Sequence, residues 1–543
     1  MLISLLLISP FVGAISMLAS SSRDAKSTFR IGLFFSALPL VLATALLFIG
    51  GSSTEPVHWF NLPGIGDSAG IEVSFSLFGY GLSLWMAWLT SLLTFLAFAY
   101  ASSAVSFGIR EFAVAFFALE GTIIGSFLSA ENIVQFLFFF EAMILPAAVL
   151  ISIHGGVKRK FATEFFAIYT LVGSIPLLFG AWYLASIAGS SNISDLALAL
   201  SALPKSTQIA LLVAFSIAFA TKTPLFPLHS WQGISYSEAP YPLTAILSGA
   251  MAKVGVFGFA FWVIPIFSHG LYEDEWNLYF IAIGLFSMIY GGLLALRQRN
   301  VKKLLAFSSL SHLGLAVAGL FCLNDEVNAG VAVLLVGHGL TAGGLFLLSG
   351  IAQKWTGSVD IKSFGAFATT NPVYATIFGI IGIAAVAVPG TVGFVGEFLI
   401  LKGLFNSALP FFALIGGVGI ILSAAYTLRL IKNTLFGEVA EGVCRSPLST
   451  LEGVAAIPVI LLIFYFGLHP APILNSLSEN RTGCTTCEYS DLIDEDSEMD
   501  IEEFLHLLDS LQNSGNDSTG AFATDTLNSS PPAQTEQQED YYE

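Results

Sequence analysis

The sequence predicts an all-α polytopic membrane protein with about fourteen transmembrane helices, and three observations support this. Of the 543 residues, 55% are hydrophobic and only 11% are charged. The mean hydropathy is +0.78, whereas a soluble chain carries about 25% charged residues. Apolar runs of about 20 residues, which is the length needed to span the hydrocarbon core, recur from Leu2 to Leu468.

The first seven apolar runs are separated by polar segments or by glycine and proline. The longest polar gap, at about 50–76, contains glycines, serines and the segment WFNLPGIG, so we expect a loop on the outer side there. The seven predicted spans are 2–19, 30–49, 77–101, 111–129, 132–153, 161–187 and 206–227.

Seven further runs follow after a polar segment at 228–241. They are predicted as spans at 242–267, 277–296, 302–322, 328–352, 373–401, 408–436 and 451–468. Two of the fourteen runs contain helix breakers: Pro224 and Pro227 in the seventh, and Pro389-Gly390 followed by Gly393 in the twelfth. Broken helices at membrane depth are tolerated only where the freed backbone groups meet protein or water. Paired breaks in corresponding halves of a chain are typical of inverted-repeat transporters.

The loop charges orient the predicted spans. Sixteen lysines and arginines fall in one set of alternate loops, including Arg23, the cluster 158–160 and the cluster 297–303. A single one, Lys205, falls in the loops of the opposite side. The positive-inside rule therefore places both termini on the outer side, which is the periplasm if the membrane is the bacterial inner membrane.

The C-terminal segment differs in composition from the rest. We expect residues 1–470 to form one transmembrane domain and 471–543 to form an acidic, disordered tail. From Glu488 onward the tail has sixteen acidic residues and no lysine or arginine, which explains most of the net charge of −17. The stretch Met499–Leu511 has helical apolar spacing. One CxxC pair, Cys484 and Cys487, is weak evidence for zinc and leaves a local disulfide or two free thiols open.

Six ionisable residues lie inside the predicted spans and form the candidate site. A charged side chain at the centre of a membrane helix costs roughly 2.5–3.5 kcal/mol on insertion scales, so such residues are rare and generally functional. Acids, lysines and histidines distributed over successive helices are the groups that a proton path requires. The six are Glu141, Lys222, Lys253, His312, His338 and Glu397.

Each of these residues has a structural alternative. Glu141 and Lys222 either form a switch, in which separating the two charges changes proton affinity, or a static ion pair that fixes helix packing. Neutral His312 and His338 either pass protons or make structural hydrogen bonds.

Four other ionisable residues are weaker candidates. His229 lies at the mouth of the seventh span, and Lys402 either belongs to the path or extends its ammonium group outward. Lys302 and Lys303 are interpreted as markers of the inner interface, with Lys303 also placed to feed His312.

Five motifs carry a resemblance to a known family. They are TKTPLFPLHSW, SEAPYPLTAILSGAMAKVGVFGF, VKKLLAFSSLSHLG, GHGLTAGGLF and VPGTVGFVGEFLIL. The chain resembles, over about residues 75–437, the antiporter-like subunits of respiratory complex I and of Mrp-type cation/proton antiporters. Glu397 makes the chain resemble the M-type members of this family, which have an acid at this position. L- and N-type members and Mrp subunits usually have a lysine there.

The resemblance implies fourteen helices with two inverted five-helix repeats, at about 111–267 and 277–436, and breaks in helices 7 and 12. It implies that Glu141, Lys222, Lys253, His312, His338 and Glu397 transfer protons. It also implies no redox centre or metal in this chain. NADH, FMN, iron–sulfur clusters and quinone are expected in partner subunits, with L- and N-type neighbours in the bilayer and no nucleic acid.

Two departures from the family pattern keep alternatives open. The segment Gln232-Gly233-Ile234-Ser235-Tyr236 replaces the usual LPDA segment and lacks its acid, and the acidic tail is not part of the pattern. The first interpretation is a proton-translocating subunit of a complex I-like NADH–quinone oxidoreductase. The alternatives are a subunit of an Mrp-type Na⁺/H⁺ antiporter and a membrane subunit of a hydrogenase-type or carbon-uptake complex.

Overall fold

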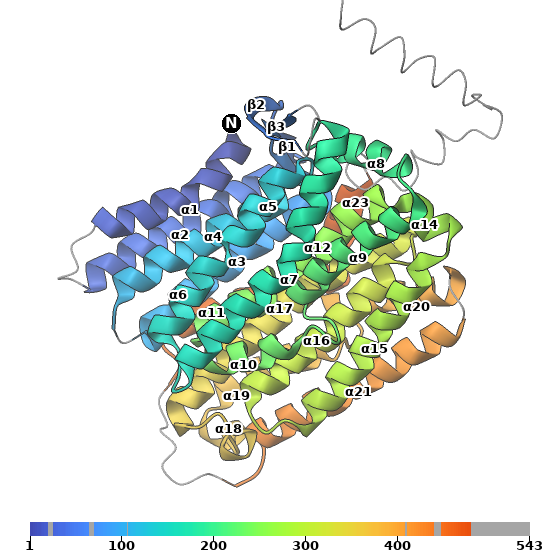
Figure 1. Cartoon of the computed structure of the whole chain (residues 1–543). Helices are drawn as coiled ribbons and strands as arrows, with labels where there is room; N and C mark the ends of the chain where they lie inside the picture. The colour runs from blue at the N-terminus through green and yellow to red at the C-terminus, as the bar shows by residue number, and fades with distance from the viewer. Residues whose placement is uncertain (20–24, 65–69, 106, 408–409, 439–446, 479–543) are drawn as a thin grey trace, which may run out of the picture. The chain divides into compact units, whose positions relative to one another are not determined.

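Helices make up nearly all of the described structure (Figure 1). The structure is a computed structural model, and it describes residues 1–19, 25–64, 70–105, 107–407, 410–438 and 447–478. The helices of the first part are α1 (Leu2–Ala19), α2 (Ala25–Phe48), α3 (Gly81–Ala104), α4 (Ile109–Leu128), α5 (Ile133–Ala142), α6 (Ile144–His154), α7 (Arg159–Ala188), α8 (Ile193–Ser201), α9 (Lys205–Lys222) and α10 (Ser230–Glu238).

The next span is irregular. It consists of α11 (Tyr241–Ile246), the π-helix η1 (Leu247–Met251), α12 (Lys253–Gly258), the π-helix η2 (Phe259–Val263) and α13 (Ile264–Ile266). The remaining helices are α14 (Ser268–Glu273), α15 (Trp276–Arg297), α16 (Val301–Leu320), α17 (Asp325–Thr356), η3 (Ile361–Ser363), α18 (Phe367–Thr370), α19 (Pro372–Ala385), α20 (Val392–Ser407), α21 (Pro410–Leu435), α22 (Thr450–Leu468) and α23 (Ala471–Ser478).

The described residues contain twelve helices that are long and apolar enough to span a membrane, or thirteen if one bent pair counts as a span. These twelve coincide with twelve of the fourteen predicted runs. The two other runs, 206–227 and 373–401, fall on interrupted helices, as their prolines predicted. The first is broken between α9 and α10, and the second between α19 and α20.

The predicted outer loop at 50–76 contains strands that the sequence analysis did not foresee. Strands β2 (Val57–Leu62) and β3 (Ile71–Phe75) form an antiparallel hairpin, and β1 (Ser52–Ser53) pairs with β4 (Phe78–Gly79). Strand β3 is mostly buried, with Ile71, Val73 and Ser74 covered and only Glu72 exposed, so the hairpin is held against the rest of the protein through this strand.

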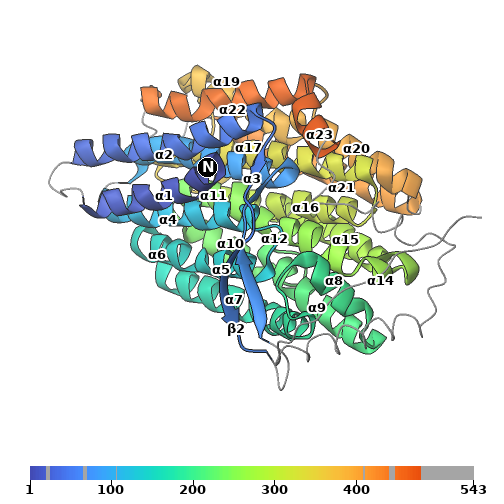
Figure 2. The ribbon, with the colours of Figure 1, turned by 90° about the horizontal axis from the view of Figure 1, so that it is seen from above.

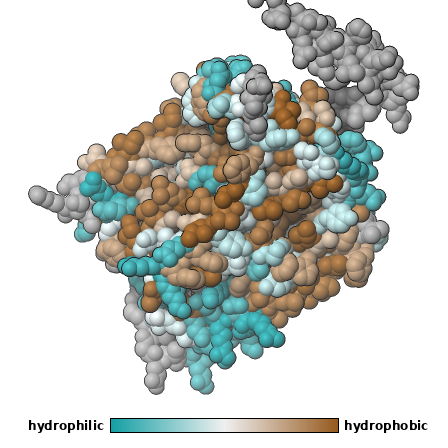
Figure 3. All heavy atoms as spheres, viewed as in Figure 1, coloured by the Kyte–Doolittle hydropathy of each residue, from teal (hydrophilic) through white to brown (hydrophobic). Residues whose placement is uncertain are grey.

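The most buried spans lie in the middle of the bundle. These are α3, the α11–α13 segment and α17, whereas about a third or less of the residues in α2, α7 and α21 are buried. Figure 2 shows α3, α11 and α17 between the outer helices. The space-filling view shows hydrophobic side chains over much of one lateral face and hydrophilic ones toward its margins (Figure 3). Lipid or neighbouring subunits must therefore cover the outer helices.

Helices α15 and α16 approach each other so closely that only glycine fits between them. A Cβ on Gly284 would lie 2.6 Å from the carbonyl oxygen of Gly314, and a Cβ on Gly314 would lie 2.6 Å from the carbonyl oxygen of Gly284. Close backbone approach through small residues is the usual basis of helix packing in membranes. This contact fixes the position of α16, which carries His312.

We predict that Gly284→Ala destabilises the protein by about 1–3 kcal/mol, because the added methyl group forces the two backbones apart. Thermal unfolding of the purified complex in detergent would measure this as a lower Tm. Gly417→Ala on α21 is the matched control, since no described atom lies within 4 Å of its Cβ position. Equal Tm values for the two variants would contradict the predicted close packing.

Candidate functional site

Lys222 is the last residue of α9, where the seventh predicted span is interrupted. The chain between α9 and α10 is held by two hydrogen bonds. Trp231 donates from Nε1 to the carbonyl oxygen of Thr221 at 2.9 Å, and the backbone amide of Phe226 donates to Ser287 Oγ at 3.1 Å. The break is thus stabilised by protein groups, as a broken membrane helix requires.

The ammonium group of Lys222 is buried and donates to a backbone carbonyl. Its Nζ lies 3.2 Å from the carbonyl oxygen of Phe140 and 4.5 Å from the centre of the Phe140 ring. That carbonyl belongs to the last turn of α5, where the helix end leaves carbonyls without intrahelical partners. Helix termination at Ala142 therefore provides the acceptor for Lys222.

Glu141, the next residue, does not form the direct ion pair with Lys222 that the sequence suggested. Among the described residues no ion pair within 4.0 Å joins the two, and both carboxylate oxygens of Glu141 are buried without a hydrogen-bond partner. The two groups are nevertheless close enough to interact electrostatically. The structure thus brings Glu141 and Lys222 together but leaves the carboxylate free of a direct bond.

Lys253 lies at the junction of the π-helix η1 and α12. Its side chain is fully buried, and Nζ donates to the carbonyl oxygen of Ser248 at 3.0 Å. The Ser248 hydroxyl lies 2.6 Å from that of Ser309, which ties η1 to α16. π-helical turns inside α-helices are frequent at functional sites. Here the irregular turn supplies the carbonyl that Lys253 uses.

His312 and Glu397 form a buried pair in the second half of the chain. His312 Nδ1 lies 3.1 Å from Glu397 Oε1, and the two side chains are 7% and 5% exposed. The His338 ring lies 5.1 Å from the His312 ring, centre to centre. Nε2 of His338 is buried and has no partner among the described residues. The three predicted residues from α16, α17 and α20 therefore meet in one cluster.

Two residues of α21 complete this cluster, and sequence reasoning missed both. Ser423 Oγ lies 3.2 Å from His312 Nε2, and the Tyr426 hydroxyl donates to Ser423 Oγ at 3.1 Å. Ser308 donates to the Tyr426 hydroxyl at 3.0 Å. Nothing in the sequence places α21 against α16, because His312 and Tyr426 are 114 residues apart.

Glu120 is a second residue that sequence reasoning missed. It is 0% exposed in the middle of α4, and neither of its carboxylate oxygens has a hydrogen-bond partner among the described residues. A lone acid in the apolar stretch 112–128 was a signal for it.

Lys302, which the sequence analysis interprets as a marker of the inner interface, is buried within the protein. Lys302 is 6% exposed, and Nζ donates to the carbonyl oxygen of Ala239 at 2.6 Å while lying 4.1 Å from the centre of the Tyr241 ring. The reason is that the first turn of α16 packs under the junction of α10 and α11, whose carbonyls replace water. Lys303, its neighbour, is only partly buried.

The two other weak candidates lie apart from the clusters. His229 lies at the break, stacked on the Phe226 ring at 5.9 Å and in edge contact with the Tyr290 ring at 5.1 Å. Lys402 is 45% exposed and forms an ion pair with Glu326 at 2.6 Å. Lys402 therefore extends to the surface, the outward alternative considered from the sequence.

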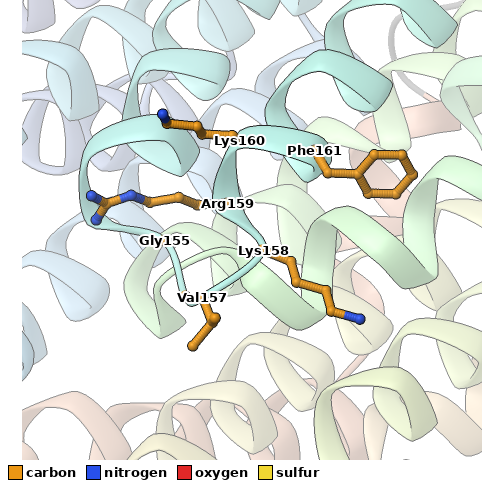
Figure 4. Close-up of a pocket in the computed structure, with 7 residues that line it drawn as sticks. Gly155, Val157, Lys158, Arg159, Lys160 and Phe161 are labelled. Atoms are coloured by element: carbon orange, nitrogen blue, oxygen red, sulfur yellow. The ribbon is translucent and has the colours of Figure 1, made fainter.

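An open cavity of about 710 Å³ lies at the basic segment Gly155–Phe161, remote in sequence from the buried clusters. Figure 4 shows that Lys158, Arg159 and Lys160 point in different directions. Their cationic groups do not converge on one ligand position. This cavity is not part of the candidate site.

Among the described residues, no three His, Cys, Asp or Glu side chains gather as a metal site would require. The Cys484–Cys487 pair and the stretch Met499–Leu511 lie outside the described residues. The fold and its two buried clusters thus define a polytopic membrane protein with ionisable chains at broken helices, suited to moving protons.

The chain belongs to the NADH:quinone oxidoreductase/Mrp antiporter transmembrane family, whose sequence model matches residues 130–423. It is 32% identical to NADH-quinone oxidoreductase subunit M of Rickettsia bellii over 489 residues, which cover 87% of this chain and 96% of that protein. The family's membrane subunits of this type carry no redox centre.

Two solved structures have the same fold. A chain of respiratory complex I from Thermus thermophilus with bound NADH matches with a TM-score of 0.76 and 30% identity, covering 88% of this chain and 98% of that one. A chain of the Mrp complex from Dietzia sp. DQ12-45-1b matches with a TM-score of 0.77 but only 19% identity, covering 90% of this chain and 99% of that one. The similarity to the Mrp complex chain, at this low sequence identity, is evidence for a shared fold only.

We predict that Tyr426→Phe destabilises the protein by about 1–3 kcal/mol, because the buried hydroxyl of Ser308 loses its acceptor. Tyr465→Phe on α22, where the side chain is half exposed, is the matched control and should change stability by less than about 0.5 kcal/mol. Thermal unfolding of both variants measures the difference. A Tyr426→Phe variant as stable as the control would show that the hydroxyl network contributes nothing.

Proposed function

We propose that this chain is the M-type, proton-translocating membrane subunit of an NADH–quinone oxidoreductase of the complex I class. The observation that carries the proposal is the 32% identity to subunit M of Rickettsia bellii along nearly the full length of both chains. Glu397, the buried acid that follows the second helix break, supports it. The Mrp-type, hydrogenase-type and carbon-uptake alternatives have no comparable support, since the likeness to the Mrp complex is one of fold.

The first half of the path consists of Glu141, Lys222 and Lys253. Lys222 releases a proton more readily when no carboxylate balances its charge, so its distance from Glu141 controls its proton affinity. The carbonyl of Phe140 holds the ammonium group in place without neutralising it. A small movement of α5 against α9 is then sufficient to change the state of Lys222, which is the switch.

Lys222 and Lys253 communicate through a tight contact between α9 and α12. Gly255, two residues after Lys253, lies against Thr223, the residue next to Lys222, with no room for a Cβ. Both lysines are buried beside this contact, and repulsion between two desolvated charges grows as their separation falls. We propose that loading one lysine with a proton favours release from the other.

The second half of the path runs from Lys253 through the histidines to Glu397. The backbones at Gly249 and Gly339, neighbours of Ser248 and His338, are in close contact, which brings η1 to α17. Lys253 interacts electrostatically with His338. A proton that reaches His338 passes to His312 and then to Glu397, which already lies at hydrogen-bonding distance from His312 Nδ1.

This chain supplies the proton path and not the redox chemistry. We assign NADH, FMN, iron–sulfur clusters and quinone to partner subunits, and L- and N-type subunits to the flanks of this chain in the bilayer. The exposed apolar side chains of α7, among them Ile168, Val172 and Phe179, are suited to such a neighbour or to lipid.

We further propose fourteen membrane crossings arranged as two inverted five-helix repeats. The twelve helical spans that are long and apolar enough to cross a membrane, together with the broken helices α9–α10 and α19–α20, give this number. The repeats, at about 111–267 and 277–436, each contain one break, in the fourth crossing of the repeat. Lys222 ends the helix before the first break, and Glu397 lies in the helix after the second.

The transmembrane domain is proposed to cover residues 1–470, with an acidic tail after it. Residues 471–478 form α23, and Ser476 Oγ accepts a hydrogen bond from Trp85 Nε1 at 2.8 Å. The start of the predicted tail therefore packs on α3. Both termini are proposed to lie on the outer side of a bacterial inner membrane, because the basic loops lie on the opposite side.

We predict that Lys222→Ala lowers NADH-driven proton pumping about tenfold or more, with quinone reduction lowered in step, because a proton-carrying group is lost. Lys205→Ala is the matched control. Lys205 starts the same helix but is 64% exposed and pairs with Asp274, so pumping should persist. Inverted membrane vesicles containing each assembled complex measure both rates.

Two results would count against this prediction. Unchanged pumping and NADH oxidation with loss of Na⁺ tolerance in cells would identify an antiporter subunit. Loss of the assembled complex, with normal pumping by what remains, would mean that Lys222 serves only helix packing.

We predict that a cysteine at Asn61, in the β2–β3 hairpin, reacts with a membrane-impermeant maleimide added outside intact cells, and that one at Lys158 does not. Both positions are exposed, so access depends on sidedness alone. In inverted vesicles the cysteine at Lys158 should react with the maleimide and the cysteine at Asn61 should not. Labelling of Lys158→Cys from outside would reverse the proposed orientation.

A further inference from the structure

Glu120 is a deeply buried acid that the path described above does not use. Its side chain is 0% exposed, and both carboxylate oxygens lack a hydrogen-bond partner among the described residues. A buried carboxyl group without a partner is costly to keep, whether it is charged or protonated. Such a group requires an explanation from what surrounds it.

The face of α4 that carries Glu120 points to α3 and α12. Phe116 and Phe127 lie on the same face, four residues before and seven after Glu120. The Phe116 ring lies 6.4 Å from the ring of Phe98 on α3, and the Phe127 ring lies 5.2 Å from the ring of Phe257 on α12. Glu120 is therefore directed at the seam between α3 and α12.

Two buried threonines of α3 lie near the depth of Glu120: the Ser83–Phe127 contact places Thr90 there, and the Phe116–Phe98 contact places Thr94 there. Ser83 Oγ donates to the carbonyl oxygen of Phe127, which fixes the register of these two antiparallel helices. Thr90 lies seven residues after Ser83, and Glu120 lies seven before Phe127, so equal rise per residue brings them to the same depth. Thr90 is 0% exposed and donates to the carbonyl oxygen of Met86 at 2.7 Å. Its oxygen can still accept a hydrogen bond from a protonated carboxyl group.

On the α12 side of the seam, Lys253 lies at a similar depth to Glu120. Phe257, which contacts Phe127, lies one helical turn after Lys253 on α12. Three spans separate α4 from the α11–α13 segment, so the two run in the same direction across the membrane. Counted from the Phe127–Phe257 contact, Glu120 and Lys253 differ in depth by three residues, about 4.5 Å at the α-helical rise.

Lys253 lacks a countercharge at ion-pair distance. Its Nζ bonds to the carbonyl oxygen of Ser248, and among the described residues no carboxylate lies within 4.0 Å of it. Glu120 and Lys253 therefore complement each other across one seam. Among the described residues, Glu120 is a buried acid without a hydrogen-bond partner, and Lys253 is a buried base without an acid at ion-pair distance.

We propose that Glu120 is a further proton-holding residue of the path, which exchanges a proton with Lys253 across the seam of α3, α4 and α12. The Lys253 ammonium group gives its proton to the Glu120 carboxylate through an intervening water molecule, leaving a neutral amine and a carboxylic acid. The reverse transfer restores both charges, and the net charge of the seam stays the same. After the forward transfer, and before the reverse one, the neutral Lys253 amine can accept the next proton while the previous one is stored on Glu120. This inference rests on the proposed function.

The test uses the assembled complex in inverted vesicles, with pumping expressed per amount of complex. Glu120→Gln keeps the shape but cannot hold the proton, and we expect NADH-driven pumping to fall about tenfold or more. Glu120→Asp keeps the carboxyl group and should retain a substantial part of the activity. Glu164→Gln on α7, where the acid is exposed, is the matched control and should pump like the wild type.

A spectroscopic measurement separates proton storage from a structural role. In the wild-type complex, the infrared C=O band of a carboxylic acid should change during NADH-driven turnover and should shift in Glu120→Asp. A Glu120→Gln complex that pumps normally would overturn the proposal, as would a band unaffected by turnover. If Glu120→Gln does not assemble, the infrared result for the wild type and Glu120→Asp decides.

A third variant separates this inference from the proposed function. If Lys253→Ala abolishes pumping and Glu120→Gln does not, only the role of Glu120 fails. If neither Lys253→Ala nor Lys222→Ala affects pumping, the proposed function fails with it.

Discussion

The arrangement of this protein depends on how it accommodates lysines inside a membrane domain. Lys222, Lys253 and Lys302 are all buried, and each donates a hydrogen bond to a backbone carbonyl, with no carboxylate at ion-pair distance among the described residues. Each carbonyl lies where helical structure is irregular: at the end of α5, in the π-helix η1, and after α10. A carbonyl dipole stabilises an ammonium group without neutralising it, so the lysine remains able to release its proton. Helix irregularity is therefore a requirement for the buried charges.

The second half of the chain handles its charges differently. His312 bonds directly to Glu397, and Ser423 and Tyr426 occupy its other side. A histidine can accept a proton on one nitrogen while it releases one from the other, so a direct chain of hydrogen bonds suits transfer there. We propose that the lysine half responds to distant charge and that the histidine half conducts. Both are needed if an event elsewhere in a complex is to drive protons through this chain.

Sequence alone predicted much of this arrangement, and the rest depended on tertiary contacts. Hydropathy predicted the apolar runs, and prolines predicted the breaks after Lys222 and before Glu397, because both signals are local. The partner of Lys222 could not be predicted, since the carbonyl of Phe140 is placed by the packing of α5 on α9. The burial of Lys302 could not be predicted, because a lysine at the start of a span is identical in sequence whether it faces water or α10. Tyr426 was missed because no local pattern relates α21 to α16.

The central claim is that the buried ionisable residues carry protons whose movement is coupled to electron transfer. Glu397 is the most direct place to test it, because it ends the proposed path and its bond to His312 is defined at 3.1 Å. The measurement is the rate of proton translocation, together with the rate of NADH oxidation, by the assembled Glu397→Gln complex in inverted vesicles. The account predicts that pumping falls about tenfold or more and that NADH oxidation by the coupled complex falls with it. If proton translocation and NADH oxidation both proceed at the wild-type rates, protons do not pass through Glu397, and the account is contradicted.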